Sequence, residues 1–332
     1  MHVRTAAILI ALLLPIATFS SAFAQPRVVA TIPPIHSLAT LVMDGVGSPR
    51  LLLTGSESPH KYTLKPSQSR ALAESEIVLR IDESFETFMK KPLRALAGRA
   101  TVVDLLEAPG VKLLKWQDEH DDHDGHQDHD DHKKHGHKDH DDHKEKAHKG
   151  HDHHDHDGEH DIHIWLHTEN AVALVKAIAG ILSEKDAANS VRYKANADRA
   201  SVRLRSLKRE LEGILQPVKN LPFMTFHDAW QYFNAEFGMK YVGAITLTPE
   251  KEPGARRITE VRKTIRKSGA RCLFSEPQFP AALAKVAVRG TPAKIAVIDP
   301  VGVNLSPGSD LYFDLMRQNA KAMISCLGRS GG

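Results

Sequence analysis

The feature that most restricts the fold is an alternation of short β-branched runs with amphipathic stretches, which occurs twice along the chain. In the first block we predict strands at 27–32, 51–54, 77–81 and 101–103, with helices at 35–43, 66–74 and 85–96. In the second block we predict strands at 223–226, 241–246, 272–275 and 294–298, with helices at 229–237, 258–267, 281–288 and 310–323. This pattern is typical of parallel sheets covered by helices on both faces.

A long helical stretch separates the two blocks. It follows a helix rich in Ala, Val and Ile at 169–182, runs from 186 to 215, and ends before Pro217. At about 1.5 Å per residue it would be on the order of 40 Å long. The apolar positions expected to face the core are Val191, Val202, Leu207, Leu211 and Leu215. We therefore predict two open α/β lobes, at 25–185 and 216–328, joined by a linking helix at 186–215.

An acidic, His-rich segment is inserted in the first lobe. Residues 120–160 hold 15 of the 21 histidines of the chain and no Leu, Ile, Val, Phe or Trp. Such a composition buries too little apolar surface to offset the entropy of ordering, so we predict a disordered loop at 118–161. Its histidines are His120, His123, His126, His129, His132, His135, His137, His140, His143, His148, His151, His153, His154, His156 and His160.

Clustered imidazoles indicate that this loop binds metal, because neutral imidazole suits zinc, nickel and copper. One alternative is a solvated charged linker without a specific role. An expression tag is disfavoured, because the run is internal, irregular and rich in acidic residues.

The N-terminus has the form of a secretory signal peptide at 1–24. Arg4 provides a basic start, 6–17 is apolar, and Ala22-Phe23-Ala24 matches a small-residue cleavage site. The apolar run is short for a membrane span, although an uncleaved anchor is the alternative. We predict a mature protein that begins at Gln25 in a bacterial periplasm.

The net charge of the chain is +3, but the segment 120–160 carries 14 acidic residues and 6 Lys, a net of −8, so the remainder carries +11. The Lys and Arg residues of this remainder are scattered over helical stretches rather than clustered with aromatic residues. We therefore read them as solvated faces and expect no nucleic-acid partner.

The chain has two cysteines, Cys272 and Cys326. Secreted proteins generally pair their thiols, and a bridge here would contribute at most about 4 kcal/mol in the chain-entropy model. The alternative is two buried free thiols. Zinc ligation by these residues is disfavoured because they form no C-x-x-C motif.

Several histidines outside the loop lie where a sheet would place ligands. His60 is in a Gly-, Ser- and Pro-rich loop after the second strand, His227 directly follows the strand 223–226, and His163 is in a short extended piece before Trp165. Asp299 follows the strand 294–298 in the same way. Ligands of open α/β sheets bind beyond the carboxyl ends of strands, and three imidazoles with a carboxylate or water can form a tetrahedral zinc site.

Each of these residues also has an ordinary structural interpretation. A single histidine at a strand end is commonly a hydrogen-bonded surface residue, and Asp299 before Pro300 could be a turn or helix N-cap residue. We assign His36 and His167 no metal role. We expect Glu276 to cap the helix that follows Pro277, with a place near the site as the alternative.

Five motifs occur in a fixed order: Gly55-x4-His60-x-Tyr62-x-Leu64-x-Pro66-Ser67, His163-Ile-Trp165-Leu166, Phe226-His227-Asp228-Ala229-x2-Tyr232-Phe233, Ser275-Glu276-Pro277-Gln278 and Asp299-Pro300-x-Gly302. Together they closely resemble the zinc-uptake substrate-binding proteins of ABC transporters, over 25–328. The resemblance implies two open parallel-sheet α/β lobes joined by one long rigid helix, a His-rich loop in this location and a disulfide in the second lobe.

The resemblance also implies metal ligands at His60, His163 and His227, with a fourth ligand that varies. Pro59 stands where zinc-binding members often have Glu, so the fourth ligand is expected to be Asp299 or water, with Glu57 as a displaced alternative. Members that take manganese usually have a carboxylate at the position of His227. Three imidazoles favour zinc over manganese, which prefers oxygen ligands.

From these features we expect a monomeric periplasmic protein that captures Zn2+ between its lobes. It would deliver the ion to an ABC permease in the inner membrane, driven by a cytoplasmic ATPase, and the His-rich loop would assist acquisition. The alternatives are a periplasmic zinc metallochaperone or buffer, an adhesin, and a manganese-type binding protein. A zinc hydrolase is disfavoured by the absence of an H-E-x-x-H motif, so no enzymatic activity is expected.

Overall fold

The computed structural model describes residues 25–54, 58, 60, 62–116, 160–246 and 253–328. The predicted signal peptide, Glu57 and the histidines from His120 to His156 lie outside these residues. Within the described ranges, no helix is both long and apolar enough to cross a membrane.

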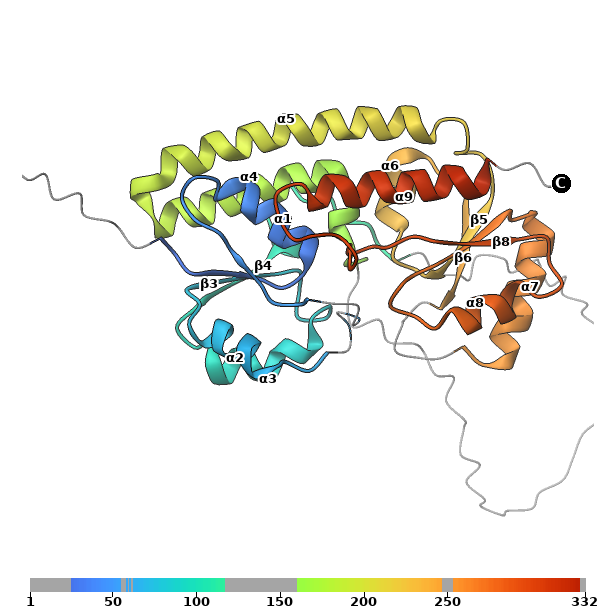
Figure 1. Cartoon of the computed structure of the whole chain (residues 1–332), viewed down its shortest axis with the longest axis horizontal. Helices are drawn as coiled ribbons and strands as arrows, with labels where there is room; N and C mark the ends of the chain where they lie inside the picture. The colour runs from blue at the N-terminus through green and yellow to red at the C-terminus, as the bar shows by residue number, and fades with distance from the viewer. Residues whose placement is uncertain are drawn as a thin grey trace, which may run out of the picture.

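The first lobe is a parallel sheet in the order β2-β1-β3-β4, drawn in blue and cyan in Figure 1. Its strands are β1 (Val28–Ala30), β2 (Arg50–Leu51), β3 (Ile77–Arg80) and β4 (Thr101–Asp104). Its helices are α1 (Pro33–Val42), α2 (Pro66–Ala73), α3 (Lys90–Leu96) and α4 (Thr168–Lys185), with short 3-10 turns at Thr87–Met89, Leu105–Glu107 and Ile164–Leu166. β1 and β3 are buried on both faces, which explains their continuous apolar sequences.

The second lobe repeats this arrangement, with the order β6-β5-β7-β8. Its strands are β5 (Phe223–His227), β6 (Tyr241–Thr246), β7 (Cys272–Ser275) and β8 (Lys294–Val297). Its helices are α6 (Gln231–Phe237), α7 (Ala255–Ser268), α8 (Ala281–Val288) and α9 (Leu311–Leu327). In each lobe the second strand lies on one side of the first strand, and the third strand lies on its other side. This reversal makes a topological switch point between β1 and β3 and between β5 and β7.

The helix α5 (Ser190–Leu215) connects the two lobes, after a 3-10 turn at Ala187–Asn189. Its 26 residues make it about 39 Å long, and it runs along the backs of both lobes (Figure 1). The C-terminal helix α9 lies beside it, and its first residues pack on α1 of the first lobe, where the Tyr312 backbone N–H donates to Ser37 Oγ at 3.1 Å. The lobes are therefore braced by two helices, of which the sequence predicted one.

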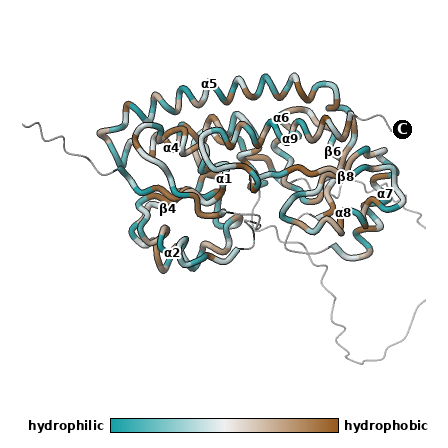
Figure 2. Tube along the Cα trace, in the orientation of Figure 1, coloured by the Kyte–Doolittle hydropathy of each residue, from teal (hydrophilic) through white to brown (hydrophobic). Residues whose placement is uncertain are grey.

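Further contacts fasten the lobes together. Glu236 of α6 caps the N-terminus of α4, since its carboxylate accepts hydrogen bonds from the backbone N–H and the hydroxyl of Thr168 at 2.7 and 2.6 Å. One continuous hydrophobic cluster contains residues of both lobes and of α4, α5 and α9. Figure 2 shows hydrophobic residues gathered at the strands and inner helices, with hydrophilic and hydrophobic residues alternating along α5. We infer that the two lobes pack as one body.

Three local predictions were wrong. Val191 and Val202 are 83% and 66% exposed, because the buried stripe of α5 passes through Ala197, Ala200 and Leu204 instead; Leu207, Leu211 and Leu215 are buried as predicted. The piece after His163 is a 3-10 turn at Ile164–Leu166 rather than extended. The stretch 85–96 forms a 3-10 turn followed by α3 rather than one helix.

Cys272 and Cys326 form a disulfide, which confirms the paired alternative over two free thiols. It ties the first residue of β7 to the last turn of α9, across 54 residues of sequence. The bridge therefore holds the bracing helix α9 onto the second lobe.

Leu204 and Val202 offer a test of this packing, because they lie on opposite faces of α5. Leu204→Ala is expected to lower the free energy of unfolding by about 2–5 kcal/mol, since the side chain is fully buried between the helices. Val202→Ala should change it by less than about 0.5 kcal/mol. Urea denaturation followed by circular dichroism measures both; equal losses would contradict the orientation of α5.

Candidate metal centre

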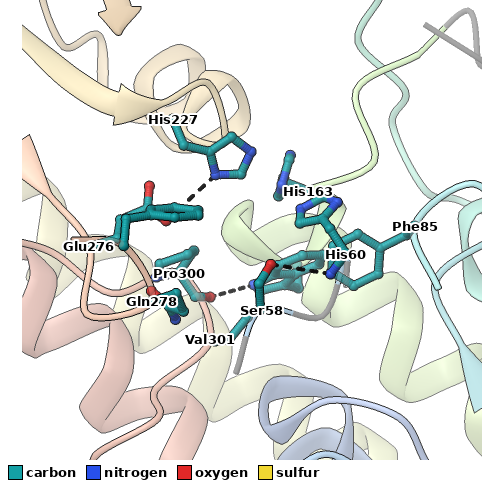
Figure 3. A pocket seen from close by; sticks show the side chains of 11 residues that line it. Ser58, His60, Phe85, His163, His227, Glu276, Gln278, Pro300 and Val301 are labelled. Carbon is teal, nitrogen blue, oxygen red and sulfur yellow. Dashed lines mark hydrogen bonds and ion pairs between the residues drawn. The ribbon is translucent and has the colours of Figure 1, made fainter. Parts of the chain in front are cut away.

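Three imidazoles from distant parts of the chain meet between the lobes (Figure 3). One ring nitrogen each of His60, His163 and His227 can be chosen so that all three lie within 4.8 Å of one another. The ring centroids are 5.0 Å apart for His163 and His227, 5.4 Å for His60 and His227, and 5.8 Å for His60 and His163. Among the described residues, this is the group of three or more metal-ligating side chains that could hold one ion.

The fold brings each histidine to the same edge. His227 is the last residue of β5, and Glu276 directly follows β7, so both lie at the switch point of the second sheet. His163 precedes the 3-10 turn that leads into α4. His60 comes from the loop between β2 and α2, and its ring packs edge-on against Phe85 with centroids 4.8 Å apart. As predicted, the first lobe provides two of the histidines and the second lobe one.

The cavity between the imidazoles is small, and aromatic and apolar side chains form much of its lining. It has a volume of ≈ 10 Å³ and is lined by Ser58, His60, Phe85, His163, Trp165, His227, Glu276, Gln278, Phe279, Pro300 and Val301. Its floor is fastened across the lobes, because the indole N–H of Trp165 donates to the Pro300 carbonyl at 2.7 Å. A space of this size suits a single ion or a water-sized group.

His163 is oriented by Asp161. The Nδ1 atom of His163 lies 2.7 Å from Asp161 Oδ1, and the same oxygen accepts the His163 backbone N–H at 2.9 Å. When the Asp161 side chain is ionised it can only accept, so Nδ1 then carries the proton and Nε2 carries the lone pair. Nε2 is buried and meets no hydrogen-bonding partner among the described residues. This arrangement of carboxylate, imidazole and free nitrogen is typical of metal-ligating histidines.

His227 has a comparable carboxylate partner in Glu276. Its Nδ1 lies 3.5 Å from Glu276 Oε2, which is an ion-pair contact but too long and poorly aligned for a good hydrogen bond. Both side chains are buried, at 3% and 2% exposure. The contact leaves Nε2 of His227 as the nitrogen available for a ligand. The prediction that Glu276 caps the next helix was wrong, because α8 begins only at Ala281 and Glu276 lines the cavity.

The protonation of the three imidazoles is uneven. Burial, with the charge of His227, holds the pKa of His60 and of His163 well below 6.5. Burial also lowers the pKa of His227, but Glu276, Asp228 and Asp161 outweigh it and raise that pKa. Burial raises the pKa of Asp161 to about 7, against its hydrogen bond from His163 and the charge of His227. His60 and His163 are therefore held neutral, the form that binds a metal.

Asp299 does not join the cluster. Its carboxylate accepts backbone N–H groups of Val301, Gly302 and Val303 at 3.0, 2.9 and 2.8 Å, and the side-chain amide of Gln278 at 3.1 Å. It thus closes the turn after β8, as in its alternative interpretation as a turn residue. Glu57, the other carboxylate considered, lies outside the described residues.

The remaining histidines behave as ordinary buried residues. His36 Nε2 lies 3.1 Å from the Pro49 carbonyl, and His167 Nδ1 lies 3.4 Å from Glu236. His160, the one described histidine of the His-rich loop, pairs as a β-bridge with Lys115. The residue that the sequence predictions missed is Asp161; its position two residues before His163 is the signal that could have identified it.

Such a centre presents three nitrogen donors to a single cation. Three neutral nitrogen donors suit borderline metals such as zinc, whereas manganese, calcium and magnesium prefer oxygen. Tetrahedral zinc holds nitrogen ligands at about 2.0–2.1 Å, so an ion would draw the three nitrogens closer than in the described arrangement.

Known proteins resemble this chain over most of its length. A family model described as "Zinc-uptake complex component A periplasmic" matches residues 28–326. The high-affinity zinc uptake system protein ZnuA of Brucella suis is 44% identical over 306 residues, which cover 91% of this chain and 92% of the relative. The protein of the same name from Paracoccus denitrificans is 34% identical over 327 residues, covering 98% and 99%.

Among solved structures, a ZnuA deletion mutant with zinc bound superposes with a TM-score of 0.71. It is 21% identical in sequence, and the match covers 92% of this chain and 100% of that one, which confirms the fold. The sequence resemblance is confirmed by the family match and by the relatives. The chain belongs to the family of periplasmic zinc-uptake complex component A.

Proposed function

We propose that this protein binds Zn2+ as cargo through His60, His163 and His227 and releases it to a membrane transporter. The observation that carries the proposal is the convergence of three buried or half-buried imidazoles from both lobes on one ion-sized cavity. Two of the imidazoles are neutral through burial, and two have carboxylate partners at Nδ1. The names of the relatives support zinc as the ion.

The nature of the donors favours zinc over manganese. An all-imidazole set is a poor match for a hard cation, and the carboxylates near the centre bind protein groups. Asp161 and Glu276 face the Nδ1 atoms of histidines, and Asp299 is held by its own turn. We infer that a water molecule completes the tetrahedron of the bound ion.

Capture and delivery, rather than catalysis, fit a small centre lined by three imidazoles. We infer that the chain is exported by the signal peptide at 1–24, acts in the periplasm as a monomer, and passes zinc to an ABC permease with a cytoplasmic ATPase. The lobes at 25–185 and 216–328, with the linking helix at 186–215, would hold the ion between them. The His-rich segment would collect further ions at lower affinity.

Substitution of the three histidines tests the site. His60→Ala, His163→Ala and His227→Ala should each weaken binding of the tightest zinc equivalent by orders of magnitude, because each removes one of three protein ligands. Competition with a chelator of known affinity measures that equivalent apart from weaker sites. His36→Gln, a buried histidine outside the cluster, serves as the control. Unchanged affinity in all three variants would refute the site.

The pH dependence of zinc binding should reflect the uneven pKa values. His227 has the raised pKa, so it is protonated first as the pH falls, and the proton then competes with the metal. Affinity should be constant at high pH and decline once the pH drops below that pKa, which lies above 6.5. Asp161, with a pKa of about 7, adds a second proton, because a nearby cation favours the carboxylate.

We therefore expect release of about one to two protons per ion between pH 5 and 7. Calorimetry in buffers of different ionisation enthalpy measures that number. Glu276→Gln should move the decline to lower pH, since it removes the charge that raises the pKa of His227. Release of three protons would contradict neutral His60 and His163.

Removal of the His-rich segment separates its role from that of the centre. Lys115 and His160 are paired as neighbours, so a chain lacking 118–159 can be closed without moving the first lobe. It should keep the tight zinc equivalent and lose the weaker ones, as counted by calorimetric titration. Loss of the tight equivalent would assign the main site to the segment instead.

A further inference from the structure

The residue whose carboxylate orients His163 is held through its backbone by the opposite lobe. Asp161 is fully buried, and its side chain fixes both the backbone and the ring of His163. Its backbone N–H donates to the Leu114 carbonyl at 2.9 Å, and its backbone carbonyl accepts the hydroxyl of Tyr232 at 2.8 Å. Tyr232 belongs to α6 of the second lobe, so the two lobes meet at the residue that sets the ligand.

The hydroxyl of Tyr232 makes two bonds at this junction. It donates to the backbone carbonyl of Asp161 and accepts the backbone N–H of Leu114 at 3.0 Å. One oxygen therefore joins the segment that ends at Trp116 to the segment that begins at His160. The neighbouring Gln231 donates its side-chain amide to the Lys115 carbonyl at 2.7 Å. Tyr232 is buried, which makes these bonds costly to leave unmade.

The same short piece of the second lobe also carries a ligand. His227 ends β5, and Tyr232 follows five residues later in α6. The second lobe therefore acts on the metal centre twice, directly through His227 and indirectly through Tyr232, Asp161 and His163. A shift of α6 relative to the first lobe would disturb both ligands together.

We propose that Tyr232 and Asp161 are positioning residues that make the hold of His163 on zinc depend on the contact between the lobes. This inference rests on the proposed zinc-binding function. Asp161 selects the tautomer and angle of the His163 ring, and Tyr232 fixes the backbone from which Asp161 acts. Loosening the lobe contact at α6 would then release the ion by weakening His163 without the lobes having to separate widely.

The test uses the full-length chain with Asp161→Asn, Tyr232→Phe and the double variant. Zinc affinity is measured by chelator competition and the dissociation rate by stopped flow. Asp161→Asn should weaken zinc binding by roughly 10–100-fold, as loss of an outer-shell partner commonly does. Tyr232→Phe should act in the same direction by a smaller factor, and both effects should fall mainly on the dissociation rate.

The decisive measurement is the coupling between the two substitutions. Because they act on one link, Tyr232→Phe should have little further effect once Asp161 is replaced. Effects that multiply independently, or affinities equal to that of the wild type, would overturn the inference. The visible spectrum of bound Co2+ adds a readout of ligand geometry and should change in both single variants.

Tyr312→Phe provides a matched control. Its hydroxyl is also buried and also crosses between lobes, donating to the Trp165 carbonyl at 2.8 Å, but it does not contact Asp161. It should lower the unfolding temperature of the metal-free protein about as much as Tyr232→Phe while leaving zinc dissociation unchanged. Equal acceleration in both variants would indicate general loosening and would overturn the inference.

The control variants also separate this inference from the proposed function. The function itself would be refuted if the wild-type chain bound no zinc tightly, or if His163→Ala left the tight binding unchanged. A wild type that binds tightly, with Tyr232→Phe indistinguishable from it, would refute only the positioning role. If Asp161→Asn does not fold, the comparison of Tyr232→Phe with Tyr312→Phe still decides.

Discussion

The fixed separation of the two sheets is the constraint on which the metal centre depends. His60 and His163 come from one lobe and His227 from the other, yet their nitrogens lie within 4.8 Å. Zinc requires these atoms at distances that tolerate only a few tenths of an ångström. A small rotation of one lobe would therefore break the set. The two bracing helices and the shared hydrophobic cluster prevent such a rotation.

Polar contacts across the lobes complete this restraint close to the centre. The indole of Trp165 binds the Pro300 carbonyl beneath the cavity, and Glu236 of the second lobe caps the helix that follows His163. These bonds are shielded at least in part from solvent and are directional, so they fix orientation as well as distance. Hydrophobic packing alone would leave the lobes able to slide by a fraction of a side chain.

The electrostatics of the site favour a cation over the protons that compete with it. Asp161 and Glu276 are buried carboxylates beside histidines, and burial raises the pKa of Asp161 to about 7 despite its hydrogen bond from His163. A divalent ion between the imidazoles would interact favourably with both carboxylates, because each carboxylate contacts a ring that binds the ion. The binding energy of the metal thus includes relief of buried negative charge.

Most of the fold was predictable because β-branched runs and amphipathic stretches alternate regularly, and buried parallel strands leave this signature. The three histidines were predictable because each follows or flanks an element end within a recognisable motif. Apolar identity did not fix the face of α5, where Val191 and Val202 point to solvent. Which side of this helix is buried depends on how it packs against α4 and α9, and residue types alone do not show it.

The carboxylates were the least predictable part of the site. Asp299 has the position of a ligand, but its oxygens are taken up by the backbone of its own turn, which depends on torsion angles that no motif records. Glu276 and Asp161 act through contacts with histidines, and those contacts exist only after both lobes have packed. The positions of residues that act by contacting a ligand are therefore determined by tertiary packing and cannot be recognised from their spacing in the sequence.

The position of α9 has a consequence for how the molecule is made. The helix α9 packs on α1, which is formed near the beginning of the chain, and on the linking helix α5. A ribosome or export channel delivers the chain from the N-terminus onward, so an unfinished molecule lacks this brace. Sites built only from early segments can trap ions during synthesis. Here the brace at α9 forms only after all three histidines of the cluster have been made, and the bond between Cys272 and Cys326 then holds it on the second lobe.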